Sequence, residues 1–266
     1  MTKKEQDFLS AMIDGDILIY QAAAATEHPI EWEPGFWTLH GFMEEAVEHF
    51  NDTLNAIIQA LNEHYDLPVY PCLCLSDAEH NFRKDIWPQY KANRATKRVP
   101  LCRRPLYVYA LNHTVNLTYK SLEGDDVLGI EMTRRSGRGE HRVCVSIDKD
   151  MNTIPGEHYN FGKDEFYVVG SFEADLNHAL QTLTGDTADG YPGCPGIGPK
   201  KALVLLDGCT TEKELWDAVV KAYEKVGQTE QQALTMARLA YILRDGDYDF
   251  EKGAVRLWQP TNPKKQ

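Results

Sequence analysis

The sequence predicts an α/β fold in which a central, mostly parallel sheet is flanked by helices. Short apolar runs alternate along the chain with longer segments in which apolar residues recur every three or four positions. Four of the short runs are followed by acidic residues. In an open parallel sheet the carboxyl ends of the strands meet at one edge, where ligand sites form. Beyond residue 183 helical spacing dominates, which predicts a terminal helical lobe.

The individual elements follow from these patterns. Residues 11–13 end a buried strand that leads to Asp14, and residues 17–25 form an alanine-rich helix. The stretch containing Trp32 and Trp37 is predicted to be a loop. The remaining predicted elements are a long amphipathic helix over 41–65, strands over 69–75, 114–119, 142–147 and 166–169, a helix that begins at 123–126 and continues through 130, and helices over 173–183, 202–206, 212–225 and 229–243.

Length and composition narrow the class of protein. A chain of 266 residues can bury one full core with an appended lobe. No run approaches the roughly 18 apolar residues that span a bilayer, and the early apolar run is broken by Asp14 and Asp16, unlike a secretory signal. We expect a soluble, cytoplasmic protein without a membrane partner. The six cysteines form no C-x-x-C pair, which predicts reduced core thiols.

A basic segment stands out against the net charge of −12. Between residues 83 and 104 the only acidic residue is Asp85, and Trp87 and Tyr90 lie among the bases. Cations beside aromatic faces suit a strand of nucleic acid with unpaired bases, although a solvated helix face is the simpler alternative. The basic residues of the segment are Arg83, Lys84, Lys91, Arg94, Lys97, Arg98, Arg103 and Arg104.

Acidic residues from five places in the chain lie at strand ends or helix starts. They are Asp14, Asp77, Glu123, Asp125, Asp126, Asp148, Asp150, Asp186 and Asp189. So many like charges cannot share a pocket without counter-ions, and hard cations such as Mg²⁺ or Mn²⁺ take carboxylate oxygens as ligands. We predict two metal ions, and the absence of a neighbouring histidine disfavours zinc. Any single acidic pair is more often a helix cap or a solvated surface.

The stretch GDTADGYPGCPGIGPKKA joins the acids to a different kind of site. It begins with Asp186 and Asp189 and continues through a Gly-Ile-Gly turn into two lysines. Glycines leave backbone amides uncovered, and the following helix start favours an anion, so a phosphate could bind without contacts to bases. The simpler alternative is a plain tight turn. The phosphate-binding residues would be Gly196, Ile197, Gly198, Lys200 and Lys201.

The motif order resembles that of the flap endonuclease and 5′-exonuclease superfamily over essentially the whole chain. The matching motifs are IDGD, LSD, PQYKANR, LEGDD, SIDKD and GDTADGYPGCPGIGPKKA. The LEGDDV and IDKDM forms and the closing ARLAYILRDGDYDF look like the 5′→3′ exonucleases of short-tailed bacteriophages. The resemblance implies a PIN/5′-nuclease-like sheet, a helical clamp at about residues 82–113, and a helix-three-turn-helix motif that binds duplex DNA. It also implies a nuclease core over 1–182 and a DNA-binding lobe over 183–266, in one compact unit.

The same resemblance suggests roles for individual residues. Asp14, Asp77, Glu123, Asp125 and Asp126 would form or support the first metal site, and Asp148, Asp150, Asp186 and Asp189 the second. Lys91 and Arg94 would contact the scissile phosphate, Tyr90 would stack on a terminal base, and Arg83 and Lys84 would steer the strand. Asp16 would at most support the ligands. Main-chain carbonyls of Gly193, Cys194 and Ile197 would bind potassium.

These expectations define a metal-dependent 5′→3′ exodeoxyribonuclease and flap endonuclease, acting as a monomer in the bacterial host cytosol. Its partner would be DNA with a 5′ end, nick, gap or flap, or an RNA–DNA hybrid, in phage replication, primer removal or recombination. Three alternatives stay open. IDGD and GDTAD also resemble motifs of aspartyl-nucleophile phosphatases, the glycine loop alone would suit a non-catalytic DNA-binding module, and metal-dependent ribonucleases share an acidic site.

Overall fold

The central sheet follows the predicted parallel pattern. A computed structural model describes residues 7–260. Six strands pair in the order β5-β4-β1-β6-β7-β8, and all neighbours are parallel except β7 and β8. The strands are β1 (Phe8–Asp14), β4 (Val69–Cys74), β5 (Asn116–Leu117), β6 (Glu140–Val145), β7 (Gly156–Asn160) and β8 (Glu165–Val169). The parallel strands bring their carboxyl ends to one edge of the sheet.

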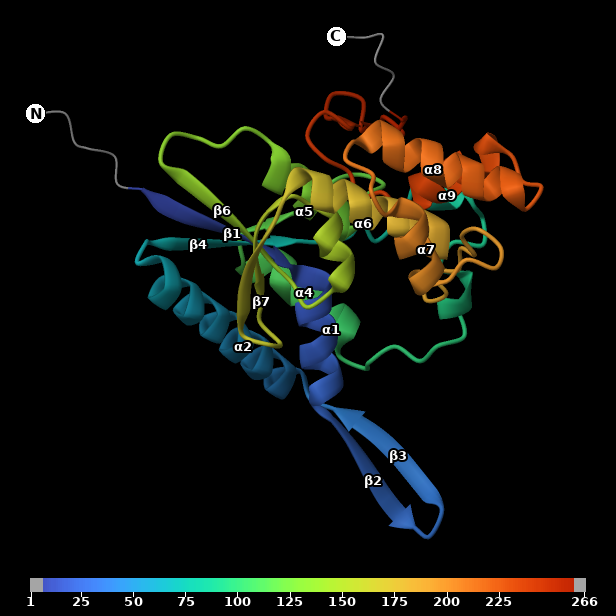
Figure 1. Cartoon of the computed structure of the whole chain (residues 1–266). Coiled ribbons are helices and arrows are strands. Elements are labelled where there is room, and N and C mark those ends of the chain that lie inside the picture. The colour runs from blue at the N-terminus through green and yellow to red at the C-terminus, as the bar shows by residue number, and fades with distance from the viewer. Residues whose placement is uncertain (1–6, 261–266) are drawn as a thin grey trace, which may run out of the picture.

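Helices cover both faces of the sheet (Figure 1). Side chains of β1 alternate between the two layers, so that Leu9 and Ile13 pack on one side and Met12 on the other. On the first side lie α1 (Gly15–Ala25), α2 (Met43–Tyr65) and α4 (Arg103–His113). On the second side lies α5 (Gly124–Thr133), next to the segment that follows the last helix. Both faces of the sheet are therefore buried, as parallel strands require.

Local sequence explains where two important helices begin and end. The α2 helix has acidic residues in its first turn, buries Phe50, Ile57 and Leu61 along one stripe, and ends at Asp66 in the left-handed region with φ 52°. At the start of α5 the Glu123 amide donates to the Asp126 carboxylate (3.2 Å), which satisfies a backbone amide at the helix N-terminus.

The C-terminal helices share a core with the helix that precedes them. These are α6 (Ser171–Thr184), α7 (Pro199–Leu206), α8 (Glu212–Lys225) and α9 (Glu230–Ala240). Leu183 of α6 packs with Leu206, Trp216 and Ala237 of the later helices. Thr211 and Thr229 cap α8 and α9 with their side-chain oxygens, which explains both helix starts.

One segment that was predicted to be a loop is a pair of strands. The stretch with Trp32 and Trp37, expected to be a loop, forms an antiparallel hairpin of β2 (Glu27–Glu33) and β3 (Phe36–Gly41). The hairpin projects from the body beyond the end of α1 (Figure 1). Neither strand contains a buried residue, so the alternating pattern of a half-buried strand is absent from the sequence.

Other differences concern element length. The expected strand over 114–119 is reduced to β5, and the expected helix over 229–243 ends as α9 at Ala240. The sequence did not predict β7, the short helix η2 (Lys149–Thr153), or the pair β9 (Tyr248–Asp249) and β10 (Ala254–Val255). The basic segment is partly helical, as expected, in α3 (Arg83–Ile86), η1 (Ala92–Arg94) and α4.

The structure also bears on the predictions about membrane-spanning helices and cysteines. In the described part of the chain, no helix is long and apolar enough to cross a bilayer. The six cysteines are free, and all but Cys209 are buried. Burial raises the pKa of the Cys74 and Cys144 thiols well above its usual range, so these groups are unreactive core side chains.

Candidate active site

An acidic cavity of about 530 Å³ lies at the carboxyl edge of the parallel strands. Seven of the nine predicted acids line it, together with Asp16 and the basic side chains of Lys91, Arg94, Arg103 and Lys149. The seven are Asp14, Glu123, Asp125, Asp148, Asp150, Asp186 and Asp189. The cavity thus collects carboxylates from β1, the start of α5, the η2 turn after β6, and the loop after α6.

Asp14 is held at the end of β1 by two hydrogen bonds. Its carboxylate accepts from the backbone amide of Ile17 (3.1 Å), which caps α1, and from the hydroxyl of Ser146 (2.8 Å). Burial raises the pKa of Asp14 to about 7, and the neighbouring Asp16 and Asp148 add to the rise, while both hydrogen bonds oppose it. A cation beside this carboxyl group would favour its ionised form.

Two more acids show the same crowding. Burial and the charge of Asp14 raise the pKa of Asp125 well above its usual range. Burial and the charge of Asp148 raise the pKa of Asp150 to about 6. A bound cation would relieve this repulsion, and hard carboxylate oxygens without a histidine or cysteine in the lining suit Mg²⁺ or Mn²⁺. Within residues 7–260, however, no three such side chains already stand close enough to hold one ion.

Glu123 lies between two basic side chains, those of Lys91 and Arg83. Lys91 Nζ contacts its Oε1, while Arg83 Nη1 (3.1 Å) and the Tyr90 hydroxyl (2.9 Å) donate to its Oε2. Burial opposes ionisation, yet the charges of Lys91 and Arg83 lower the pKa of Glu123 to about 2. Glu123 therefore remains ionised throughout the physiological range.

The clamp residues are attached to the GDTAD loop. Arg94 Nη2 lies 2.6 Å from Asp189 Oδ1, the Lys91 amide donates to the Asp189 carbonyl (2.7 Å), and Asn93 donates to the Thr187 carbonyl (2.8 Å). Lys91 adopts a left-handed backbone conformation with φ 55°, and its side chain lines the cavity. The basic segment therefore lies directly over the acids, and Arg94 stays half-exposed at the rim.

Two predicted acids lie outside the cavity. Asp77 accepts backbone hydrogen bonds from Glu79 (2.9 Å) and Ser121 (2.7 Å), and so holds two loops together. Asp126 is fully buried and pairs with both terminal nitrogens of Arg83 (2.6 and 2.8 Å). Neither carboxylate faces the space that the other acids share.

Two predicted nucleic-acid contacts are also buried. Arg83 is 3% exposed, and its guanidinium points into the protein rather than toward a strand, which contradicts a steering role. Tyr90 is 3% exposed, which leaves its ring no free face for a base. Its hydroxyl lies within hydrogen-bond distance of the carboxylates of Glu123 (2.9 Å) and Asp189 (3.0 Å). Lys84 remains exposed beside a second cavity that contains Asp77.

Sequence reasoning gave too little weight to Asp16. It lies in the first turn of α1, two residues after Asp14, and its carboxylate lines the cavity, accepts from the Ser76 amide (2.9 Å) and lies 3.9 Å from Arg103. The signal was present in the IDGD motif, because a strand that runs directly into a helix can turn both acids toward the same edge.

The glycine loop forms a separate surface at the start of α7. Gly198 is the N-cap residue, followed by Pro199, and the Lys201 ammonium donates to the Gly196 carbonyl (2.9 Å). Ile197, Lys200 and Lys201 line an open groove of about 790 Å³ with no residue in common with the acidic cavity.

The residues expected to bind potassium lie just before this groove. Gly193 has φ 66°, and the Cys194 carbonyl accepts from the Ile197 amide (3.2 Å).

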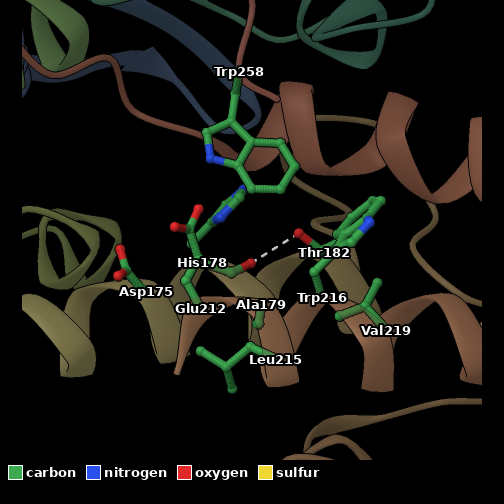
Figure 2. A pocket seen from close by; sticks show the side chains of 9 residues that line it. All are labelled: Asp175, His178, Ala179, Thr182, Glu212, Leu215, Trp216, Val219 and Trp258. Carbon is green, nitrogen blue, oxygen red and sulfur yellow. Dashed lines mark hydrogen bonds between the residues drawn. The ribbon is translucent and has the colours of Figure 1, made fainter. Parts of the chain in front are cut away.

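A third cavity is too small for a nucleotide. Figure 2 shows it between α6, α8 and Trp258, lined by His178, Thr182 and Glu212 among others. Its volume is about 20 Å³, enough for about one water molecule. The acidic cavity is thus the better candidate for a reaction site.

Comparison with known proteins assigns the chain to a family. A family model described as "5′-3′ exonuclease, N-terminal resolvase-like domain" matches residues 10–174, more than half of the chain. The chain is 28% identical over 283 residues to the exodeoxyribonuclease of Enterobacteria phage T3, covering 94% of this chain and 93% of that protein. It is also 28% identical over 281 residues to the exonuclease of Escherichia phage T7, with the same coverage.

The fold agrees with this assignment. A solved structure of T5 5′-exonuclease with bound divalent metal ions (zinc) superposes with a TM-score of 0.60 and 16% identity, over 87% of this chain and 89% of that one. The chain therefore belongs to the 5′-3′ exonuclease family, within the flap endonuclease and 5′-exonuclease superfamily, and it is a nuclease.

Proposed function

We propose that the acidic cavity hydrolyses DNA phosphodiester bonds from a 5′ end or at a 5′ flap. The observation that carries this proposal is the shared lining of one cavity by seven family-motif acids and by Lys91 and Arg94 of the PQYKANR motif. The names of the relatives, an exodeoxyribonuclease and an exonuclease, support the same substrate class.

We further propose that these acids hold two divalent cations. Asp14, Glu123 and Asp125 would serve the first ion, and Asp148, Asp150, Asp186 and Asp189 the second. Asp77 and Asp126 would support the site from outside, and we add Asp16 to the cavity residues. Two bound Mg²⁺ or Mn²⁺ ions would supply an activated water molecule and charge neutralisation at the scissile phosphate. The raised pKa values of Asp14 and Asp150 fit a site that awaits positive charge.

Lys91 and Arg94 would bind the scissile phosphate. Here they neutralise Glu123 and Asp189, and a phosphate that enters the cavity would compete for the same two cations. Because both side chains line the cavity, their charges would stabilise the negative charge that develops on the phosphate oxygens. Tyr90 would hold Glu123 and Asp189 together rather than stack on a base.

The start of α7 would grip duplex DNA, as in a helix-three-turn-helix motif. The exposed start of α7 at Gly198 and the exposed Lys200 and Lys201 fit a phosphate. Potassium bound to carbonyls of Gly193, Cys194 and Ile197 remains part of this proposal. Residues 183–266 would form the DNA-binding lobe and residues 1–182 the nuclease core, in one compact monomer, because α6 shares its core with the later helices. We also propose that the enzyme acts on RNA in RNA–DNA hybrids, and that it serves in phage replication, primer removal or recombination.

The test is a product ladder from 5′- and 3′-labelled duplex, flapped and RNA-primed substrates, in Mg²⁺ and in Ca²⁺. We expect short products with 5′-phosphates, released from the 5′ end in Mg²⁺ only. Binding without cleavage would favour an accessory DNA-binding module. Hydrolysis of a small phosphate ester with no action on DNA would favour a phosphatase.

Metal binding has its own test, which does not depend on cleavage. Because a ligand of the folded state stabilises that state, millimolar Mg²⁺ is expected to raise the melting temperature. The Asp14→Asn, Asp148→Asn double variant is the control and should lose the shift. An unchanged melting temperature of the unmodified protein would contradict the proposed metal sites.

A further inference from the structure

The Arg83 guanidinium uses all of its hydrogen-bond donors inside the protein. Nε donates to the Leu239 carbonyl (3.0 Å), and Nη2 donates to the Tyr241 carbonyl (2.7 Å) and to Asp126 (2.8 Å). Nη1 donates to Asp126 (2.6 Å) and to Glu123 (3.1 Å). Five N–H groups thus meet two carboxylates and two main-chain carbonyls, which no other side chain type could do.

Arg83 joins three parts of the chain that are distant in sequence. It belongs to α3 at the base of the clamp, its carboxylate partners stand at the start of α5, and its carbonyl partners lie at the end of α9 and just beyond. The last two parts are in close contact, because a Cβ on Gly129 of α5 would lie 2.4 Å from the Leu243 carbonyl. The Leu243 amide also donates to Asp126 (3.2 Å). The chain after α9 is therefore fixed to the helix that carries the LEGDD acids.

Only one of these groups reaches the acidic cavity. Glu123 lines the cavity, whereas Arg83 and Asp126 do not. Glu123 Oε2 accepts from Arg83, which leaves Oε1 directed toward Lys91 in the cavity. Asp126 accepts from the Glu123 amide (3.2 Å) and so holds the backbone of the same residue. The direction of the Glu123 carboxylate is thus set from behind, by Arg83 and Asp126 together.

We propose that Arg83 is a positioning residue for the nuclease site. It orients the Glu123 carboxylate and links that orientation to the docking of the chain that follows α9. This inference rests on the proposed function in one respect, namely that Glu123 helps to hold a divalent cation. A lysine at position 83 would keep the positive charge, but its three donors leave a single atom and could not serve four acceptors in a plane. The Glu123 carboxylate would then lose its orientation, although the positive charge at position 83 would remain.

Arg142 provides a matched control. Its side chain is also buried, pairs with Glu140 (2.8 Å), and donates to the main-chain carbonyls of Glu131 (2.6 Å) and Arg134 (2.8 Å). It lines no part of the acidic cavity. If Arg83 only stabilises the fold, Arg83→Lys and Arg142→Lys should both lower the melting temperature and leave the Mn²⁺ affinity unchanged. If Arg83 positions Glu123, only Arg83→Lys should lower the Mn²⁺ affinity.

The experiment compares the two variants in the full chain by Mn²⁺ titration followed by electron paramagnetic resonance, with Mg²⁺-dependent cleavage and duplex affinity in Ca²⁺ alongside. For Arg83→Lys we expect Mn²⁺ affinity to fall by about 10- to 100-fold, as for other partners that orient a metal ligand, with unchanged duplex affinity. The half-maximal Mg²⁺ concentration for cleavage should rise in parallel. For Arg142→Lys we expect a lower melting temperature with unchanged Mn²⁺ affinity.

Asp126→Asn gives the same test if Arg83→Lys does not fold. It keeps the shape of the side chain, weakens the hold on Arg83, and removes no carboxylate from the cavity, so Mn²⁺ affinity should again fall. Normal Mn²⁺ affinity in a folded Arg83→Lys or Asp126→Asn protein would overturn the inference and leave the proposed function intact. Failure of the unmodified protein both to bind Mn²⁺ and to cleave DNA would overturn the proposed function, and this inference with it.

Discussion

The pKa values of the cavity carboxylates depend on which charged groups lie beside them. Glu123, next to Lys91 and Arg83, has a pKa lowered to about 2 despite its burial. Asp14, next to Asp16 and Asp148, has a pKa raised to about 7, chiefly by burial. The sequence predicted that acids would converge, but it could not predict this division. The division depends on the side-chain geometry of α3 and η1, which no residue pattern encodes.

Lys91 is the residue whose removal should affect turnover most selectively. In Lys91→Ala the site loses the cation that contacts Glu123 and, as we propose, the scissile phosphate. Loss of one such charge-stabilising donor lowers kcat by about 100-fold or more. Steady-state kinetics on a flapped duplex would measure this, with duplex affinity in Ca²⁺ measured alongside.

Lys97→Ala is a suitable control for this variant, because Lys97 is an exposed base of the same segment that lines no part of the cavity. Equal losses of binding and turnover in Lys91→Ala would assign Lys91 to general substrate attraction instead of catalysis.

His178 predicts how stability changes with pH. Burial lowers its pKa to about 4, although the hydrogen bond to the Ala237 carbonyl (2.9 Å) opposes the change. The folded state therefore keeps the ring neutral, while the unfolded chain takes up a proton near its ordinary pKa of 6.5. Stability from this group is complete above that value and falls by about 1.4 kcal/mol per pH unit between 6.5 and about 4.

Urea unfolding at several pH values across this window checks the prediction. The free energy of unfolding of the natural protein, minus that of His178→Gln, should shrink as the pH falls. A difference that stays constant with pH would show that the ring is not held neutral.

At the scale of elements, the sequence was most informative where burial follows a period. The 41–65 helix and the strand at 69–75 were predicted almost to the residue, because one buries a stripe and the other is covered on both faces. The hairpin of β2 and β3 was missed for the opposite reason. Its exposed Trp32, Phe36 and Trp37 lack a buried face, and Pro29 and Pro34 resemble loop signals.

The base of this hairpin contacts the basic segment. Glu27 pairs with Arg98 (2.6 and 2.7 Å) and accepts from the Leu101 amide (2.8 Å). Glu27→Ala should free residues 95–102 and speed tryptic cleavage at Lys97 and Arg98 by about fivefold, because local opening exposes the chain to the protease. Limited proteolysis with mass spectrometry measures the rate.

Glu31→Ala serves as the control, since Glu31 bonds only within the hairpin turn, to the Gly35 amide (3.1 Å). Cleavage at an unchanged rate in Glu27→Ala would mean that the clamp is held by its contacts with the GDTAD loop alone.

For the whole molecule, one topological rule predicted most of the site. Parallel strands share an edge, so the acids after β1 and β6 had to meet, and the resemblance supplied the loop after α6. The rule fails beyond strand ends. Asp77 lies three residues after β4 and Asp126 one turn into α5, and in both cases local turn geometry decides where the carboxylate points. An acid at the end of a strand is therefore more reliably predicted to line the cavity than an acid a few residues further along the chain.

The separation between the acidic cavity and the α7 groove predicts separable functions. A Cβ added at Gly198 meets no atom within 4 Å, so Gly198→Ala should fold normally. If this turn contacts a duplex phosphate, its affinity for duplex DNA should fall by about tenfold while cleavage of short single strands continues. Asp189→Asn should instead lose cleavage of short single strands while it keeps its affinity for duplex DNA.

Binding by fluorescence anisotropy and cleavage of a short oligonucleotide measure the two effects. Parallel losses in both variants would indicate one continuous site instead of two.

The five tryptophans lie in three places that can be distinguished by fluorescence: the hairpin, the basic segment and the C-terminal region. Trp32 and Trp37 on the hairpin are more than half exposed, so their emission is red-shifted and open to a soluble quencher. Trp87 donates to the Gly190 carbonyl (3.3 Å) at the junction of clamp and GDTAD loop. Trp216 and Trp258 stack edge to face with ring centroids 5.3 Å apart. Replacing the hairpin pair with phenylalanine would leave a protein whose intrinsic fluorescence reports clamp docking and the integrity of the C-terminal helices, without any attached dye.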